Sequence, residues 1–251
     1  MLDSGMRWIA RRTLPEDVRR WLRGRRDGNP WAPPVGRVRF GSFRRLTPIS
    51  REYGFDRGLP VDRWYIEQFL EHCALDVKGH VLEIKDDAYT RRFGGDRVTA
   101  SDVLCLEADD PRATIVGDLV ALDHVASNSF DCAIVTQTLQ LVYDVGAALR
   151  TLHRILRPGG VLLATVPGLS QTSPHQEWGD RWAWGFTRVS AARLVGEAFP
   201  GGEVAVESFG NVMTAIAYLH GLSAEELEPD ELEHQDPEYQ LSIGIWARKG
   251  G

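Results

Sequence analysis

The stretch FDCAIVT, residues 130–136, decides the fold class of this chain. Its apolar residues do not alternate with polar ones, which is typical of a strand covered on both faces of a parallel sheet. An apolar helical face over Asp144–Leu156 follows, and RPGG at residues 157–160 ends that helix before a second apolar run at Val161–Val166. Strand, helix and buried strand in this order predict an α/β fold with a parallel sheet.

The flanking sequence extends this sheet in both directions. Three short apolar runs upstream, each followed by polar turn residues, predict strands at Val81–Ile84, Arg97–Ser101 and Ala113–Val116. Helical spacing of aromatic and apolar residues predicts a helix that begins near Asp62, which we interpret as its N-cap. The other predicted elements are helices over Ser190–Phe199 and Val212–Leu222 and strands over Glu203–Ser208 and Gln240–Ala247.

Length and composition favour one domain with an accessory segment. A chain of 251 residues with 43% hydrophobic content buries one sizeable core, whereas two full domains would be cramped. No apolar run reaches the roughly 18 residues of a membrane helix, and the first residues lack the pattern of a signal peptide, so we expect a cytoplasmic protein. The histidines are isolated in the sequence, and we therefore expect no metal site.

Charge is segregated along the chain. Residues 1–51 hold 13 arginines and four acidic residues, or about +9, although the whole chain carries −6. We therefore divide the chain into a basic N-terminal arm and linker, residues 1–53, and a main domain, residues 54–251. The arm has the pattern of an amphipathic helix. We expect this helix either to dock on the acidic body of its own chain or of a second copy, or to contact a partner, a lipid surface or nucleic acid.

The run from residue 130 to residue 167 resembles the class I S-adenosylmethionine-dependent methyltransferases. The resemblance rests on the strand FDCAIVT with the following QTL, on Asp144, and on the helix that leads through HRILRPGG to VLLATVP. It covers residues 79–167 well and the last third in outline. It implies a Rossmann-like seven-stranded sheet with helices on both faces and an antiparallel last strand, which binds S-adenosylmethionine and releases S-adenosylhomocysteine.

The same resemblance implies roles for residues at the strand ends. Glu83 matches the acidic position that holds the turn and the amino-acid end of the cofactor. Asp102, 19 residues further on, with its neighbour Val103, matches the position that binds the ribose hydroxyls. Asp118 matches the position that binds the adenine amino group, with the Leu119 amide beside it. Two residues that close the fourth strand would face the sulfonium and its methyl group: Thr136 and Gln137.

The turn after the first strand lacks the glycines of the family. The three expected glycine positions are Lys85, Asp87 and Tyr89. Side chains there block the close approach of a pyrophosphate, so a dinucleotide cofactor is excluded. S-adenosylmethionine carries no phosphate and has a net positive charge, so Asp86 or Asp87 would attract it. Lys85, or Arg63 on the preceding helix, would bind its carboxylate.

A long segment after the fifth strand, residues 167–187, is expected to form the acceptor site. Loops of this length are usually functional or disordered, and its three tryptophans argue against disorder. Transfer to a hydroxyl requires removal of a proton, for which His175 is the first candidate and Asp180 the alternative. Tyr143 would orient the acceptor. The tryptophans either bind a sugar ring or pack the segment onto the domain.

A narrower resemblance links the chain to glycan chemistry. The motifs GFDRG (54–58), YTRRFGG (89–95) and GNV (210–212) resemble a bacterial group of methyltransferase-like proteins joined to or encoded near glycosyltransferases. Two hypotheses follow: O-methylation of a sugar or glycan-like small acceptor, or a catalytically inactive binding or scaffold module in glycan assembly. The expected partners are that acceptor, a glycosyltransferase and a second copy of the chain, with membrane contact of the arm kept open and nucleic acid not expected.

Overall fold

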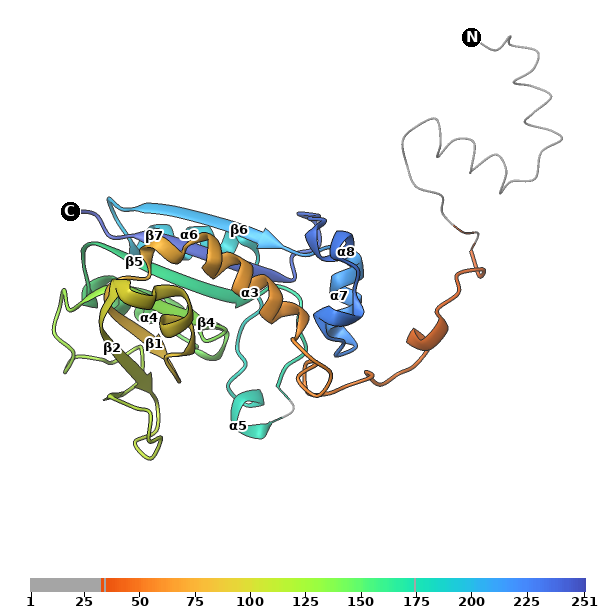
Figure 1. Ribbon diagram of the computed structural model, residues 1–251, viewed down its shortest axis with the longest axis horizontal. Coiled ribbons are helices and arrows are strands. Elements are labelled where there is room, and N and C mark those ends of the chain that lie inside the picture. The colour runs from red at the N-terminus through yellow and green to blue at the C-terminus, as the bar shows by residue number, and fades with distance from the viewer. Residues whose placement is uncertain (1–32, 34, 174) are drawn as a thin grey trace, which may run out of the picture. The chain divides into compact units, whose positions relative to one another are not determined.

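The computed structural model describes residue 33 and residues 35–173 and 175–251, and the chain divides into the units Met1–Leu46 and Thr47–Gly251. The second unit is the predicted α/β domain (Figure 1). The arginine-rich part of the predicted arm lies outside the described residues. Residues 47–53, assigned to the linker from the sequence, are part of the second unit, where the amides of Ile49 and Ser50 donate to the carbonyl of His220.

The sheet has seven strands in the order β3-β2-β1-β4-β5-β7-β6, and β7 runs antiparallel to both of its neighbours. This confirms the predicted fold class and the antiparallel last strand. The order reverses between β1 and β4, which pair in parallel. The strands are β1 Gly79–Ile84, β2 Val98–Cys105, β3 Ile115–Val116, β4 Phe130–Thr136, β5 Leu156–Pro167, β6 Glu203–Phe209 and β7 Ser242–Arg248.

Helices cover both faces of this sheet because successive strand residues point to opposite sides. Leu82 belongs to a core cluster that also contains residues of α4 and α6, whereas the adjacent Val81 belongs to a second cluster with Ile66 and Phe69 of α3. All four of these side chains are at most 1% exposed. The helices are α3 Val61–His72, α4 Val145–Ile155, α5 Gln176–Gly179, α6 Arg188–Ala198, α7 Val212–Leu219 and α8 Pro229–Glu233.

Two boundaries differ from the sequence prediction and matter for the site. The second strand extends to Cys105, four residues beyond the predicted end at Ser101. Helix α3 begins at Val61 after Pro60, so the predicted N-cap Asp62 is inside the helix and caps nothing. Pro60 occupies the N-cap position, and no side chain caps the helix there.

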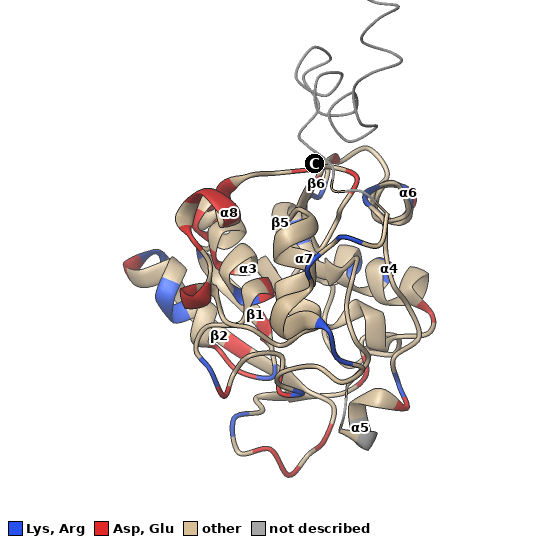
Figure 2. Cartoon of the chain, turned by 90° about the vertical axis from the view of Figure 1, so that its right-hand side faces the viewer, with Lys and Arg blue, Asp and Glu red and all other residues tan. Residues whose placement is uncertain are grey.

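The segment around α7 and α8 packs against residues 49–60. Pro60 forms a β-bridge with Ser223, and Arg57 binds the carboxylate of Glu226. Acidic residues gather over α8 in this part of the domain (Figure 2). Within the described part of the chain, no helix is long and apolar enough to cross a membrane.

Candidate active site

A cavity of about 1170 Å³ opens at the carboxyl ends of the parallel strands. Residues that follow four neighbouring strands line it: Lys85 after β1, Glu107 after β2, Asp118 after β3 and Gln137 after β4. The β1–β4 pair is the point where the strand order reverses, and open α/β sheets bind their ligands at such points. The volume exceeds that of a typical small-molecule site and has room for a cofactor and an acceptor.

Glu83 is buried at the end of β1 and holds the turn that follows. Its carboxylate accepts hydrogen bonds from the Tyr89 amide (3.2 Å), the Thr90 amide (2.7 Å) and the Thr90 hydroxyl (2.7 Å). Burial raises the pKa of Glu83 to about 7, although these three donors oppose the shift. Glu83 therefore stabilises the turn, as expected, and it can change its charge near neutral pH.

Lys85 occupies the first missing glycine position with the backbone of a glycine. Its φ is +77°, in the left-handed region that side chains rarely adopt. The Lys85 ammonium lies 4.9 Å from the centre of the Trp178 ring, so the side chain leaves the turn and reaches the long segment after β5. The turn thus keeps the geometry of a glycine turn while it carries a side chain.

This conformation leads to a prediction about substitutions at residue 85. Lys85→Gly should retain the free energy of unfolding of the wild type to within about 1 kcal/mol, whereas Lys85→Val should lose about 2 kcal/mol or more, because a β-branched residue is strained at positive φ. Chemical denaturation of both variants measures the difference. Equal stability of the two variants would show that residue 85 is not held at positive φ.

Arg63 and Tyr89 lie together on the wall of the cavity. An Arg63 guanidinium nitrogen donates to the Tyr89 hydroxyl at 3.2 Å, and both residues line the cavity. The guanidinium has five N–H donors, so this bond leaves capacity for a carboxylate. Asp86 also lines the cavity, and one of its oxygens accepts from the Ala88 amide.

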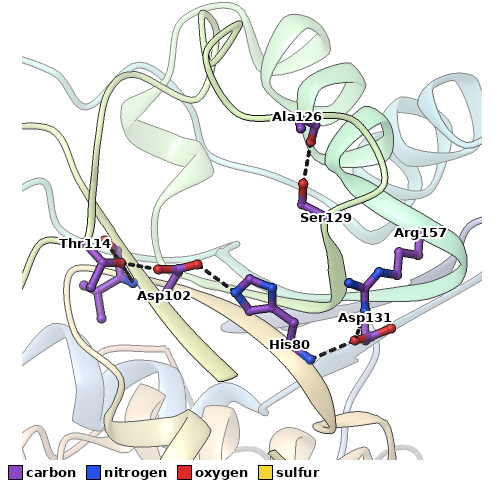
Figure 3. Close-up of polar contacts among 8 residues, drawn as sticks. His80, Asp102, Thr114, Ala126, Ser129, Asp131 and Arg157 are labelled. Carbon is purple, nitrogen blue, oxygen red and sulfur yellow. Dashed lines mark hydrogen bonds and ion pairs between the residues drawn. The ribbon is translucent and has the colours of Figure 1, made fainter. Parts of the chain in front are cut away.

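The structure does not bring Asp102 and Val103, the residues predicted to bind the ribose, to this cavity. Both residues lie inside β2, and neither lines the cavity. Asp102 binds His80 Nε2 at 2.7 Å and the Thr114 hydroxyl at 2.6 Å in a separate cavity of about 430 Å³ (Figure 3). Val103 is 6% exposed, and its amide donates to Thr114. The difference follows from the strand boundary, since a strand that ends at Ser101 would have put Asp102 at the sheet edge.

Glu107 is the acid that the corrected boundary brings to the cavity after β2. It lies two residues beyond Cys105, and its side chain is 64% exposed. One carboxylate oxygen lies 3.9 Å from an Arg181 nitrogen. The sequence signal was present, because the apolar run VLCL at residues 103–106 continues the strand and Glu107 is the first acid after it.

Asp118 and Leu119 lie where the sequence places them. Both line the cavity just after β3. One Asp118 oxygen accepts from the Val120 amide at 3.0 Å, which fixes the carboxylate in a turn and leaves the second oxygen without a hydrogen bond in the described structure. Leu119 is 5% exposed and belongs to the core cluster beneath the site.

Thr136 and Gln137 close β4 and also line the cavity. Gln137 has a φ of +45°, and its amide donates to the carbonyl of Thr165 at 2.9 Å. Of the four non-glycine residues at positive φ in the described chain, three line this cavity: Tyr53, Lys85 and Gln137. Such strain is concentrated at functional sites, where the surrounding structure holds it.

The structure brings two of the three predicted catalytic residues to the cavity. His175 and Tyr143 line the cavity; the His175 side chain is 64% exposed, with Nε2 at 3.7 Å from a Glu52 oxygen. Tyr143 is 82% exposed, and its ring lies 5.9 Å from that of Trp184. Asp180, the predicted alternative base, is exposed and is not part of the cavity wall, although the next two residues, Arg181 and Trp182, line it.

Three residues that the sequence did not mark form one wall of the cavity: Tyr53, Asp62 and Tyr218. The Tyr218 hydroxyl lies 3.4 Å from one Asp62 oxygen and 3.2 Å from the Ser170 hydroxyl. Burial raises the pKa of Asp62. No local pattern could reveal this group, because its members come from segments up to 165 positions apart that only the packing of α7 brings together.

The tryptophans of the long segment have two different roles. Trp178 and Trp182 line the cavity, as does Phe55 from the segment before α3. Trp184 instead packs on the domain, where its indole N–H lies 3.1 Å from the carbonyl of Val142 and 3.2 Å from that of Tyr143. Among the residues described, no group of three or more His, Cys, Asp or Glu side chains could hold a metal ion.

Comparison with known proteins agrees with this architecture. Residues 67–164 match the family described as "Methyltransferase domain". A malonyl-(acyl-carrier protein) O-methyltransferase of Pseudescherichia vulneris is 35% identical over 94 residues, which are 35% of this chain and 37% of that relative.

Solved structures share the fold at low identity. An S-adenosylmethionine-dependent methyltransferase of Mesorhizobium loti has a TM-score of 0.50 at 18% identity, covering 78% of this chain and all of that one. One from Archaeoglobus fulgidus has a TM-score of 0.50 at 11% identity, covering 74% of this chain and 94% of that one. The 4+2 cyclase SpnF also scores 0.50, at 17% identity with 93% of both chains covered.

The seven-stranded fold is thus similar to that of solved S-adenosylmethionine-dependent methyltransferases, and the segment of residues 67–164 is similar to the methyltransferase domain family. The similarity to SpnF, a 4+2 cyclase, shows that proteins of this fold differ in activity, so the fold alone does not fix the reaction.

Proposed function

We propose that the protein transfers the methyl group of S-adenosylmethionine to a hydroxyl of a sugar or glycan-like small acceptor. The observation that carries the proposal is the charge of the cavity wall. Eight acidic residues line the cavity, Glu52, Asp62, Glu83, Asp86, Glu107, Asp110, Asp118 and Asp144, against three basic ones, Arg63, Lys85 and Arg181. A wall of this sign attracts a cationic cofactor and repels a phosphate-bearing one.

The residues present fit the chemistry of that cofactor. Asp118 and Glu107 offer carboxylate oxygens for the adenine amino group and the ribose hydroxyls, and Arg63 offers donors for the carboxylate of the amino-acid end. Glu83, beneath the turn, would meet the ammonium. When bound, S-adenosylmethionine supplies an activated methyl group on sulfur, and the protein has to position an acceptor and take up its proton.

The acceptor proposal rests on the rest of the cavity wall. Trp178, Trp182 and Phe55 provide apolar surface that suits the C–H faces of a sugar ring, and polar residues also line the cavity. The acidic wall does not suit a carboxylate substrate like that named for the Pseudescherichia relative. The glycosyltransferase partner and the homodimer remain predictions from the sequence.

The alternative, an inactive methyltransferase-like module in glycan assembly, draws its support from the side chains at the glycine positions. Tyr89 stands at the third of these positions and lines the cavity. It leaves a volume of about 1170 Å³ open, however, because its hydroxyl binds Arg63 at the wall. A cavity with room for the cofactor favours the active methyltransferase over the inactive module.

Binding of S-adenosylhomocysteine tests the proposed function directly. Titration calorimetry should show binding to the wild type, and Asp118→Asn and Glu107→Gln should each weaken it about 10-fold, as expected for the loss of one hydrogen bond to a carboxylate. Asp102→Asn is the matched control, since it changes an aspartate outside the cavity, and it should leave the affinity within about twofold. Absence of heat with the wild type at millimolar ligand would refute the proposal.

A further inference from the structure

Three buried oxygen atoms on the cavity wall lack a hydrogen-bond partner within the described structure: the Tyr53 hydroxyl, Asp62 Oδ1 and Gln140 Oε1. Asp62 Oδ1 and Gln140 Oε1 are both inaccessible to solvent, and neither meets a donor within the described structure. Asp62 is 9% exposed and Gln140 is 2% exposed, and both residues line the large cavity. A buried polar atom without a partner costs roughly 1–3 kcal/mol, so three in one cavity indicate that a ligand supplies partners there.

Neighbouring contacts indicate whether Asp62 Oδ1 and Gln140 Oε1 donate or accept hydrogen bonds. Gln140 Nε2 donates to the carbonyl of Gln137 at 2.8 Å, which assigns the other end of the amide as the acceptor oxygen. The second Asp62 oxygen faces the Tyr218 hydroxyl, whereas Arg63, the adjacent cation, directs a guanidinium nitrogen to Tyr89. Both of these atoms are therefore hydrogen-bond acceptors, and both call for a ligand that donates.

Gln140 connects this pair to the expected position of the methyl group. It lies in the short helix Leu139–Leu141 just after β4, and its side chain binds Gln137, which closes that strand. Asp62 reaches the same cavity from α3, on another segment of the chain. A donor group held between Asp62 and Gln140 would thus lie on the side of the cavity where the methyl group is delivered.

We propose that Asp62 and Gln140 form the acceptor subsite, that they bind an uncharged hydroxyl of the acceptor, and that Asp62 is the general base of the transfer. This inference rests on the proposed function. The acceptor oxygen forms a bond to the methyl carbon while the carbon–sulfur bond breaks, and that electron pair stays on sulfur, which becomes the neutral thioether. The hydroxyl proton passes to the Asp62 carboxylate, and the product is a methyl ether.

Asp62 suits this role better than His175. Asp62 is buried at the proposed subsite, where burial raises the pKa of its carboxyl, whereas the His175 side chain is 64% exposed. The Tyr218 hydroxyl beside Asp62 would keep its carboxylate oriented. An acceptor that is itself an acid finds no donor at Asp62 or Gln140, so the subsite selects against carboxylates and phosphates.

The test uses sinefungin, an analogue that carries an ammonium in place of the sulfonium methyl group, beside S-adenosylhomocysteine, which has nothing there. Calorimetry should show that the wild type binds sinefungin at least 10-fold more tightly, because the ammonium donates to Asp62 and Gln140. Asp62→Asn should remove most of that preference and keep the S-adenosylhomocysteine affinity within about twofold. Glu52→Gln, which changes another acid on the cavity wall, should keep the preference.

The outcomes separate the two proposals. Equal sinefungin preference in the wild type and Asp62→Asn, with both ligands bound, would overturn the acceptor subsite and leave the proposed function standing. Failure of the wild type to bind either ligand would overturn both. If Asp62→Asn does not unfold cooperatively, the same two affinities are measured for Gln140→Leu. A several-fold loss of the preference for sinefungin in this variant supports the subsite, and an unchanged preference refutes it.

Discussion

Between pH 8 and pH 5.5, the affinity for S-adenosylhomocysteine is expected to fall about 30-fold. The raised pKa of Glu83, about 7, means that this carboxyl is largely protonated at pH 5.5 in the free protein. The ammonium of the ligand requires the charged carboxylate, so binding lowers the pKa and expels a proton. Affinity therefore rises with pH up to about 7 and is constant above it, in proportion to the ionised fraction of Glu83.

Calorimetry in two buffers of different ionisation enthalpy measures the effect. Near pH 6, close to one proton should be released for each ligand bound. Glu83→Gln should bind weakly with an affinity that no longer depends on pH in this range. His175→Asn is the control for a second ionising group in the same cavity, since a histidine gains positive charge in acid and would also repel the ligand. An affinity that is flat with pH in the wild type would show that Glu83 does not meet the ammonium.

The sequence predicts most of the fold because the fold depends on local patterns. The buried strand at residues 130–136 and the helix after Asp144 are each visible in a short window, and the structure has both within one residue. Residues 157–160, predicted as the turn that ends this helix, belong instead to β5. The antiparallel last strand came from the family resemblance, and the pairing of β7 with β5 and β6 confirms it.

The site was harder to predict because it depends on strand ends and on distant contacts. The predicted end of β2 at Ser101 pointed to Asp102, whereas the strand ends at Cys105 and the first acid after it that lines the cavity is Glu107. Positive φ at Lys85 cannot be read from a lysine, although the family position implies it. Asp62 looked like a helix cap, and only the approach of Tyr218 from α7 identifies it as part of the cavity.

The same ionisation of Glu83 is expected to act on stability with the opposite sign. The pKa of Glu83 is about 7 in the folded protein against about 4.5 for an exposed glutamate, so the folded state holds the proton more strongly. The stabilisation is complete below pH 4.5, and it is lost as the pH rises to 7. The free energy of unfolding should fall by about 3 kcal/mol over this range from Glu83 alone.

Urea denaturation from pH 4.5 to pH 8, without ligand, tests this. Glu83→Gln should flatten the curve, but some slope should remain because burial also raises the pKa of Asp62. Saturating S-adenosylhomocysteine should oppose the decline, since the ligand binds the ionised form more tightly. A free energy of unfolding that rises from pH 4.5 to 7 in the wild type but not in Glu83→Gln would mean that the carboxylate is stabilised in the turn by its three donors. The protein would then bind its cofactor without releasing a proton.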